Sequence, residues 1–329
     1  MIRRCTISDI EKLQKFYNEN WGSKHPLINI RNFFDFYFLD GNDINFIVYL
    51  DENNEIVSSC GYTLSNKTEN PSIWTTLWLT KKSSIQNAGL QIVDYIVENL
   101  GFNIVSTNNA RKNTLALYKF LGYKTSKLNH YYRLFEKSQY HIAIIDNFVS
   151  LPYEKTSYIL KPFSTIECLK KEFNPSDYYH NKPYKDIDYI EKRLYNFPFI
   201  KPLIYGIFNE NNKCVAIIAM RYIDVNNARV LRIIDVIGDY TSIANIGHDL
   251  NQLGTDCEYI EFYSYGVDDE ILRKAGFVKR DEDDKNIIPA YLEPYNPINT
   301  DYYFFSTDID NFTMFMGDGD QDRLNINIL

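Results

Sequence analysis

Apolar residues near the N-terminus follow a helical period, and those that follow them have the period of strands. Ile10, Leu13 and Tyr17 fall on one side of a helix. Residues 44–50 and 55–63 are rich in β-branched and aromatic side chains and are joined by the turn-forming sequence DENN. Along residues 1–135 the pattern predicts helices at 7–18, 28–38, 86–99 and 114–121, and strands at 44–50, 55–63, 73–79, 102–106 and 128–135.

The second half of the chain repeats this outline. It shows a hairpin around NENN, then a strand, a helix, a strand and a short helix, at 204–208, 214–222, 230–237, 241–253, 259–265 and 270–274. The Glu-Asn-Asn turns at 52–54 and 210–212 precede two Gly-aromatic helix stops, Gly122-Tyr123 and Gly276-Phe277, by similar distances. We interpret this as a degenerate internal duplication; two unrelated α/β domains are the alternative.

The predicted fold is therefore α/β with two tandem units. Each unit is a mixed, mostly antiparallel sheet flanked by helices, and the second unit is degenerate. We expect the strand at 128–135 to close the first unit and residues 136–143 to join the two. This gives a first domain at 1–140 and a second at 141–329.

Composition and charge narrow the range of functions. The net charge of −8 and the lack of a basic tract argue against nucleic-acid binding. No apolar run reaches about 18 residues, so we expect no membrane span. The 5 cysteines are scattered without CxxC spacing, which predicts free thiols in a reducing cytoplasm and no metal site.

The strongest chemical signal is a strand, a loop and a helix within residues 75–99. Backbone N–H groups at a helix N-terminus favour an anion, and phosphate above all. The loop could cradle a pyrophosphate through Gln86, Asn87, Ala88, Gly89, Leu90 and Gln91. Among these, Gly89 would permit close approach of the backbone.

A second motif follows this loop one strand later. Leu117, Tyr118, Gly122 and Tyr123 form the pattern L-Y-x-x-x-G-aromatic. The two motifs together resemble the GNAT acyltransferase superfamily, whose donor motif Q/R-x-x-G-x-G/A matches here at Gln86 and Gly89, while Gln91 replaces the final Gly or Ala. The resemblance covers roughly residues 1–135; the second unit carries Asp239 where a phosphate would bind.

The resemblance implies a site for acyl-CoA as co-substrate. Pantetheine would lie along the strand that contains Leu77 and Leu79, with a backbone N–H near Leu79 polarising the thioester carbonyl. Asn113 would contribute to the donor site, although Arg111 replaces the family's usual Asn. Tyr118 would protonate the leaving thiolate; a packed aromatic side chain is the alternative.

The candidates for the acceptor site are more dispersed. Trp21 and His25 lie in the first long loop, where His25 could accept the amine proton, bind a hydroxyl, or merely be solvated. The second half offers a strand with a charge at each end and two polar segments, with the candidate residues Arg232, Asp235, Tyr291, Glu293, Asp320 and Arg323. The acids of the tail at 317–323 either bind the acceptor or are simply solvated.

The tandem arrangement resembles N-acyltransferases of nucleotide-linked amino sugars, of the dTDP-3-amino-3,6-dideoxyhexose type. The segments NWGSKHPL, LNHYYRL, RLYNFPF, IIPAYLEPY and GDGDQDR carry this resemblance. It implies transfer of an acetyl or 3-hydroxybutyryl group to a sugar amine for surface polysaccharide such as O-antigen. The alternatives are an N-acyltransferase acting on a peptide or another amine, and a non-catalytic binding protein of the same ancestry.

Overall fold

The apolar runs build two sheets in the computed structural model, which describes residues 1–82 and 85–323. The first sheet contains, in spatial order, β1 (Ile2–Thr6), β3 (Asp43–Leu50), β4 (Ile56–Leu64), β5 (Ile73–Thr80), β6 (Val105–Ala110), β15 (Tyr303–Ser306) and β7 (Lys124–Lys127). A short strand, β2 (Leu39–Asp40), also pairs with β3. The second sheet contains, in spatial order, β14 (Val278–Lys279), β8 (Asn129–Leu134), β13 (Tyr259–Tyr265), β12 (Ala228–Gly238), β11 (Cys214–Val225), β10 (Leu203–Phe208) and β9 (Ile159–Pro162). A short strand, β16 (Met314–Phe315), also pairs with β13.

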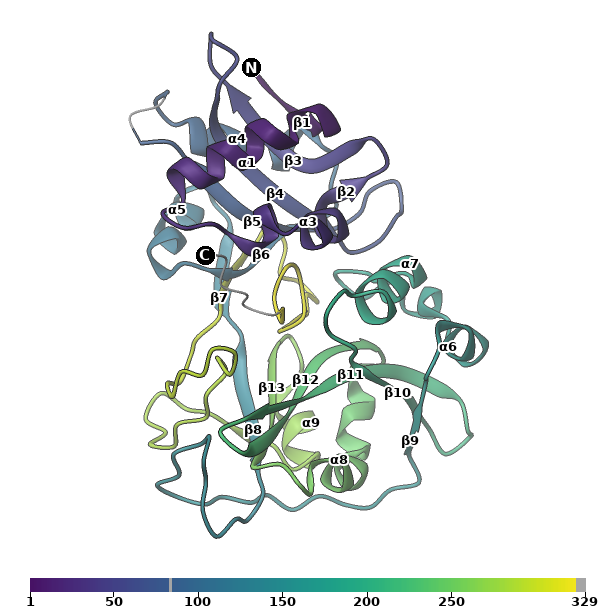
Figure 1. Cartoon of the computed structure of the whole chain (residues 1–329). Helices are drawn as coiled ribbons and strands as arrows, with labels where there is room; N and C mark the ends of the chain where they lie inside the picture. The colour runs from purple at the N-terminus through teal and green to yellow at the C-terminus, as the bar shows by residue number, and fades with distance from the viewer. Residues whose placement is uncertain (83–84, 324–329) are drawn as a thin grey trace.

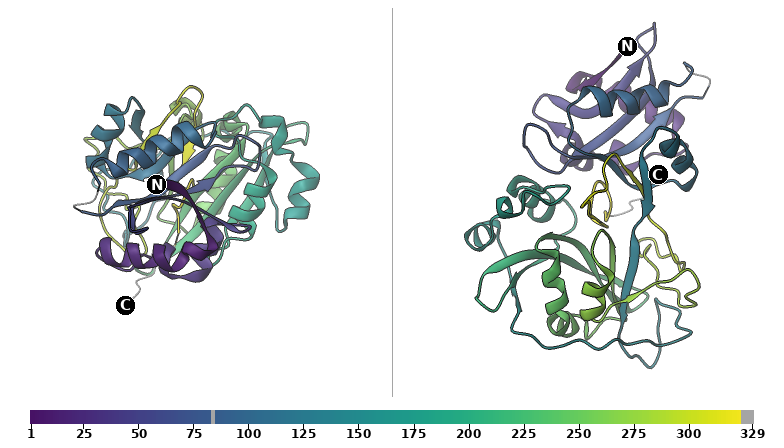
Figure 2. Two further views of the ribbon diagram at one scale, coloured as in Figure 1. Left: turned by 90° about the horizontal axis from the view of Figure 1, so that it is seen from above. Right: turned by 180° about the vertical axis from the view of Figure 1, so that it is seen from behind.

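Helices cover both faces of the first sheet (Figures 1 and 2). Along β3 the side chains of Phe46 and Val48 pack towards one helical layer and Ile47 towards the other, as the strand period requires. The first layer is α1 (Ile10–Asn20), α2 (Pro26–Asn29) and α3 (Arg31–Phe38), and the second is α4 (Ala88–Asn99) and α5 (Leu115–Phe120).

The second sheet is also flanked by helices. Leu250 of α8 (Gly247–Gly254) and Leu272 of α9 (Asp269–Lys274) pack with its apolar side chains on one face. On the opposite side lie α6 (Ile166–Glu172) and α7 (Ile187–Ile190). The predicted fold class is confirmed: an α/β chain with two mostly antiparallel sheets, each flanked by helices.

One predicted helix is two. The segment expected to be helical at 28–38 breaks at Ile30, whose extended backbone (φ −92°, ψ 110°) separates α2 from α3. The break follows from the early start of α2, where Pro26 occupies the first turn and the His25 side chain caps it. As a result, α3 is a helix separate from α2, and its aromatic side chains pack onto the first sheet.

The two sheets exchange strands. The strand predicted at 128–135 forms as β8, but it pairs antiparallel with β13 of the second sheet, so the expectation that it closes the first unit is wrong. That place is taken by β15 from the C-terminal part of the chain, which lies between β6 and β7. In Figure 1, β7 and β8 follow each other as one extended ribbon between the two sheets. The functional roles assigned to residues 1–140 and 141–329 stay predictions.

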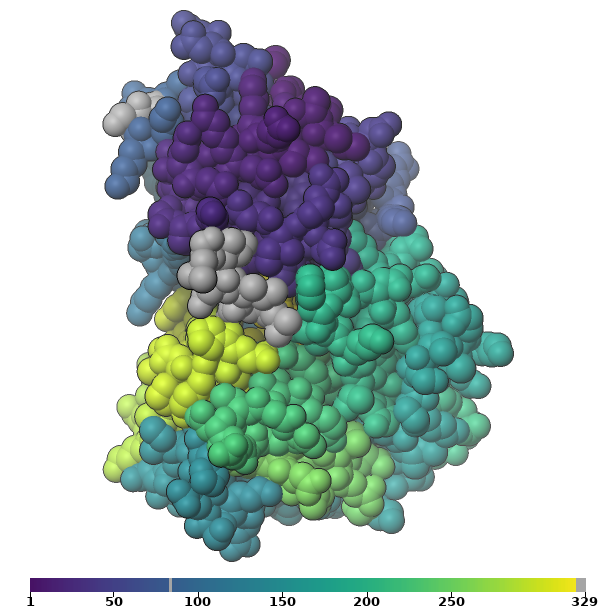
Figure 3. Space-filling view, viewed as in Figure 1, coloured from purple at the N-terminus to yellow at the C-terminus, as the bar shows by residue number. Residues whose placement is uncertain are grey.

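The C-terminal segment lies between the two units. In the space-filling view its yellow residues lie on the left, below purple N-terminal residues and above green ones, while teal and green residues meet the purple ones on the right (Figure 3). Asp318, Asp320 and Asp322 are at most 6% exposed, so the interpretation of the tail acids as solvated is wrong. Within the described residues, every helix is too short or too polar to cross a bilayer.

Candidate active site

The two parallel strands of the first sheet separate soon after they meet. β5 and β6 pair at Ile73↔Val105 and Trp74↔Ser106 and then diverge towards their C-terminal ends. A cavity of about 360 Å³ opens between them, and residues from the first loop, α5 and the C-terminal tail complete its walls. We call this cavity the β5/β6 slot. It brings together these predicted site residues: Trp21, His25, Leu77, Leu79, Tyr118, Asp320 and Arg323.

A bulge in β5 shapes the slot. The pairing of β4 with β5 shifts between Ser59↔Leu79 and Gly61↔Thr76, so β5 carries an extra residue there. Leu77 adopts φ 52°, in the left-handed region that a bulky side chain rarely enters. Its carbonyl accepts a hydrogen bond from the hydroxyl of Tyr17, which is fully buried in α1. The hydroxyl thereby stabilises the turned backbone at the wall of the slot.

Tyr118 presents its side chain to the slot from α5. It is 4% exposed and stacks on Phe305 of β15, with ring centroids 3.9 Å apart. Burial raises the pKa of the Tyr118 phenol well above its ordinary value, so the hydroxyl stays protonated at neutral pH. Tyr118 can therefore act as a hydrogen-bond donor. Its ring is held by Phe305, whose place here no sequence pattern predicted.

The predicted phosphate loop lies at the N-terminus of α4. Gln86 and Asn87 are exposed, and Asn87 (φ 60°) precedes the first helical residue, Ala88, whose N–H donates to the carbonyl of Ile85 at 3.1 Å. The side chain of Gln91 donates to the carbonyl of Gln86 at 3.4 Å. Leu90 is half-buried in the first turn. Binding of a pyrophosphate at this exposed helix end stays a prediction.

Gly89 makes a close approach inside the protein itself. A Cβ at this position would lie 2.6 Å from Oγ1 of Thr80 and 3.2 Å from the ring of Trp78. The glycine thus lets α4 begin directly against the end of β5. A larger residue here would disturb the fold as well as any ligand, so substitution of Gly89 is a poor test of phosphate binding.

His25 is held as a helix cap at the slot. Its Nδ1 accepts the N–H of Leu27 at 3.3 Å, and its ring meets that of Trp21 edge to face at 5.4 Å between centroids. Burial, followed by the charge of Arg323, lowers the pKa of His25 to about 4, while Asp320 opposes the shift. The imidazole is neutral at pH 7 and, with Nδ1 engaged, carries its proton on Nε2. This geometry favours donation to an acceptor hydroxyl over removal of the amine proton.

The other predicted acceptor residues fall into different places. Asp320 and Arg323 line the slot, and Arg323 also lines a neighbouring cavity of about 100 Å³ together with Arg232, Tyr291 and Glu293. Asn113, which was predicted for the donor site, is exposed and lies outside the residues that line the slot.

Two of the predicted acceptor residues, Arg232 and Asp235, form ion pairs inside the protein. Arg232 donates to Glu261 at 2.6 Å and to Asp322 at 3.0 Å, and Asp235 lies 2.6 Å from the ammonium of Lys185. All of them are at most 6% exposed. Their charges are therefore neutralised inside the protein, which removes the reason to expect Arg232 or Asp235 at a substrate.

Sequence reasoning missed most of what anchors the tail. The amide of Asn108 in β6 donates to the carbonyls of Phe315 and Asp318 at 3.0 and 3.1 Å, and the guanidinium of Arg193 donates to the carbonyl of Gly317. The available signal was the apolar run before Gly317, which indicates a segment entering the core rather than leaving it. Within the described residues, no group of three His, Cys, Asp or Glu side chains could hold a metal ion.

Comparison with known proteins gives a likeness in structure alone. No family model matches the sequence, and no curated protein matches it. A GCN5-related N-acetyltransferase from Anabaena variabilis ATCC 29413 superposes with a TM-score of 0.58 at 9% identity, over 93% of this chain and 72% of that one. A conserved protein of unknown function from Enterococcus faecalis V583 gives 0.55 at 8% identity, over 93% and 71%.

A GCN5-related N-acetyltransferase from Kribbella flavida also superposes on the same share of this chain. It gives a TM-score of 0.50 at 10% identity, over 93% of this chain and 70% of that one. At these identities the comparisons establish the fold and nothing finer. The chain has a GNAT-like fold in which two sheet units are present.

Proposed function

We propose that this chain is an acyl-CoA-dependent N-acyltransferase whose donor binds in the β5/β6 slot. The observation that carries the proposal is the divergence of β5 from β6 at the bulge of Leu77, with the side chain of Tyr118 on the wall of the opening. The GNAT-like fold supports it. Pantetheine would lie along Leu77–Leu79, and the pyrophosphate would lie at the exposed N-terminus of α4.

The chemistry requires few groups from the protein. The acceptor nitrogen attacks the thioester carbonyl carbon, a C–N bond forms, and a backbone N–H near Leu79 stabilises the oxyanion. Collapse breaks the C–S bond, the nitrogen loses one proton, and the sulfur gains one. CoA thiol has a pKa of about 8.5, like cysteine. Because the phenol of Tyr118 is a weaker acid than this, its hydroxyl stabilises the departing thiolate by a hydrogen bond.

An acidic side chain in the slot supports an acceptor that carries an amine. Asp320 is the one carboxylate among the described residues that line the slot, and it can accept a hydrogen bond from the N–H of a neutral acceptor amine. We propose a nucleotide-linked amino sugar as acceptor, with Trp21, His25 and Arg323 around the sugar and Tyr291 and Glu293 in the adjoining cavity. The free cysteines fit an enzyme of the reducing cytoplasm.

A peptide amine is the second candidate acceptor. It is favoured by the loss of Arg232 to internal ion pairs, because this leaves fewer cations for a diphosphate. A binding protein without activity is the remaining alternative.

The test is incubation with acetyl-CoA or 3-hydroxybutyryl-CoA and either dTDP-linked amino sugars or short peptides. Thiol release and the mass of the amide product are measured. We expect CoA to raise the melting temperature and one acceptor class to give product. A CoA-dependent shift without product from any amine would identify a binding protein. No CoA-dependent shift at all would refute the donor site.

A further inference from the structure

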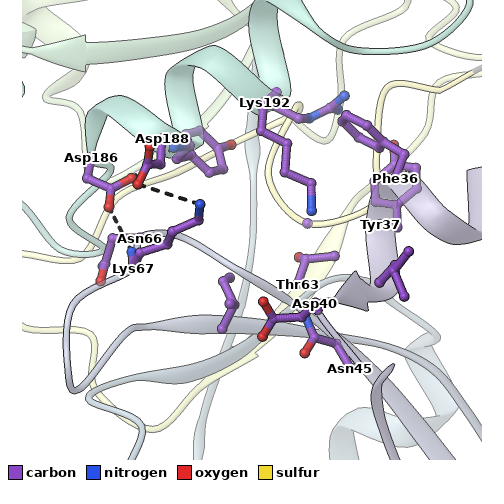
Figure 4. Close-up of a pocket in the computed structure, with 16 residues that line it drawn as sticks. Phe36, Tyr37, Asp40, Asn45, Thr63, Asn66, Lys67, Asp186, Asp188 and Lys192 are labelled. Atoms are coloured by element: carbon purple, nitrogen blue, oxygen red, sulfur yellow. Dashed lines mark hydrogen bonds and ion pairs between the residues drawn. The ribbon is translucent and has the colours of Figure 1, made fainter. Parts of the chain in front are cut away.

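A cavity of about 310 Å³ lies between the two units, away from the β5/β6 slot (Figure 4). One wall comes from α3, β2 and the ends of β3 and β4, and the other comes from α7 and the helical turn Glu191–Tyr195. Gly319 is the only residue of the tail among the described residues that line it, and none of its lining residues lines the slot.

Most charges around this cavity are already paired within the protein. Asp188 lies 3.7 Å from the ammonium of Lys67, and Asp186 accepts the backbone N–H of Lys67 at 2.7 Å. Asp40 pairs with Arg4 at 2.9 Å. These contacts leave the carboxylates partly neutralised, and the pairs at Lys67 connect the two units along the rim.

Lys192 is different. Its side chain points into the cavity in Figure 4, and no ion-pair partner for its ammonium occurs among residues 1–82 and 85–323. The ammonium lies 5.5 Å from the ring centroid of Phe36. Lys192 is exposed as a whole residue, and desolvation by the cavity walls lowers the pKa of its ammonium, while Asp40 raises the pKa and Lys67 lowers it further. An anion placed here would give this ammonium the charged partner that it lacks among the described residues.

Apolar side chains form part of the remaining wall, beside the polar side chains of Asn45, Thr63 and Asn66. Phe36, Tyr37 and Tyr189 contribute aromatic rings, and Leu39 and Leu64 contribute aliphatic side chains. A flat or branched apolar body of small size fits such walls. The nearby carboxylates of Asp40, Asp186 and Asp188 oppose a doubly charged anion, since each added negative charge is repelled at short range.

We propose that this cavity is a binding site for a small organic monocarboxylate with an apolar body, held by Lys192 and the aromatic walls and contacting both units. The carboxylate accepts a charge-assisted hydrogen bond from the Lys192 ammonium, and the body packs on Phe36 and Tyr189. The source is either a free acid or an amino acid, whose ammonium would face Asp40 or Asp188. The site is separate from acyl transfer and does not depend on it.

The test is calorimetric titration of the whole chain with probes that share one apolar body. Phenylacetate carries the anion alone, phenylalanine carries both charges, and phenethylamine carries the cation alone; inorganic phosphate tests a dianion. We expect phenylacetate to bind with a dissociation constant on the order of 1 mM or below. Phenylalanine binding as tightly as phenylacetate would point to amino acids, and weaker binding would point to free acids; either result agrees with the site.

Lys192→Met keeps the stem over Phe36 and removes the charge. It should weaken phenylacetate binding by about tenfold or more, the effect of losing a hydrogen bond to a charged group. Lys170→Met is the matched control, because Lys170 pairs with Glu191 outside the cavity and its loss should leave the affinity unchanged. Saturating CoA should not displace phenylacetate. Unchanged binding in Lys192→Met, tighter binding of phenethylamine or phosphate, displacement by CoA, or no binding of any probe at about tenfold above the expected constant would each overturn the proposal.

Discussion

Each sheet contains one pair of parallel strands among the described residues, and the two pairs differ in what lies beside them. β5 has a bulge at Leu77, and β12 has one at Ile234, where its register with β11 shifts between Asp235↔Ala219 and Ile233↔Met220. A strand of each parallel pair thus carries a bulge, although only Leu77 has a left-handed backbone. Beside the first bulge the slot is open, whereas beside the second the chain itself fills the space.

The C-terminal segment occupies the second position as a ligand would. Met314 and Phe315 pair with β13, and the N–H of Gly317 donates to the carbonyl of Ile234 at 2.9 Å. A Cβ on Gly317 would lie 2.4 Å from the side chain of Ile234, so only glycine fits there. One slot has become part of the core, and the other remains available for a substrate. This difference locates the proposed activity in the first unit.

We call the space beside the bulge of Ile234, which the C-terminal segment occupies, the filled slot. Removing Lys185, the cation between two of its carboxylates, should have the largest effect on stability. Lys185 is 4% exposed and lies 2.6 Å from both Asp235 and Asp318. Lys185→Met leaves these carboxylates without their cation, and we expect the free energy of unfolding to fall by about 3–5 kcal/mol. Urea denaturation measures this. Lys170→Met, which breaks an exposed pair, should leave the free energy of unfolding nearly unchanged; equal losses in the two variants would mean that the filled slot is not held by its charges.

In the open slot the corresponding test is Tyr118→Phe. The ring and its stacking on Phe305 remain, but the hydroxyl that stabilises the thiolate is lost. We expect kcat to fall by roughly 10²-fold with little change in KM for acyl-CoA, because the contact strengthens only in the transition state. Steady-state kinetics measure the turnover of the variant, and a melting curve measures its stability. Turnover within about threefold of wild type, well below the effect of losing a hydrogen-bond donor to the transition state, together with a lower melting temperature would make Tyr118 a packing residue.

The two bulges are held by different donors, and Tyr17→Phe exploits this difference. Leu77 depends on a side-chain hydroxyl, whereas Ile234 depends on a backbone N–H. Leaving the carbonyl of Leu77 without its donor should cost about 1–3 kcal/mol of stability and lower kcat by up to about tenfold. Tyr195→Phe removes a similar bond to the carbonyl of Phe163 in the second unit. That control should lose stability alone, and an equal loss of turnover in both variants would contradict a positioning role for Tyr17.

The smallest expected effect concerns His25 and acid. Its pKa in the folded protein, about 4, lies below the ordinary value of 6.5, so the unfolded chain binds the proton more readily. Stability should therefore be unaffected by His25 above pH 6.5 and should fall as the pH drops from 6.5 towards 4. His25→Gln should flatten this part of the stability curve measured by thermal melting. An unchanged dependence of stability on pH would show that His25 is solvated and has an ordinary pKa in the folded protein.

Local pattern predicted the elements that carry the open slot. The hairpin of β3 and β4, the strand β5, the helix α4 and the helix of Tyr118 were all expected close to their observed positions, because their apolar periods are strong and their turns are typical. The candidates Trp21, His25 and Tyr118 do line one cavity with Leu77 and Leu79.

Long-range pairing was not predictable from these patterns. β8 and β15 are both rich in aromatic residues, and nothing in their own residues specifies which sheet they join; the choice depends on packing with strands far away along the chain. The same holds for Arg232 and Asp235. Their partners, Glu261 and Lys185, come from other segments, so a strand with charged ends suggested a substrate site where the structure has internal ion pairs.

The central claim, that the open slot binds acyl-CoA, is tested most directly by blocking it. Ala110 lines the slot at the end of β6, and Ala116 is exposed on α5 outside it. Acetyl-CoA is titrated by calorimetry into wild type, Ala110→Trp and Ala116→Trp. The account predicts equal affinity for wild type and Ala116→Trp, and a loss of at least about tenfold for Ala110→Trp, whose ring would occupy the place of pantetheine. Binding to Ala110→Trp as tight as to wild type, with both variants folded, would contradict it.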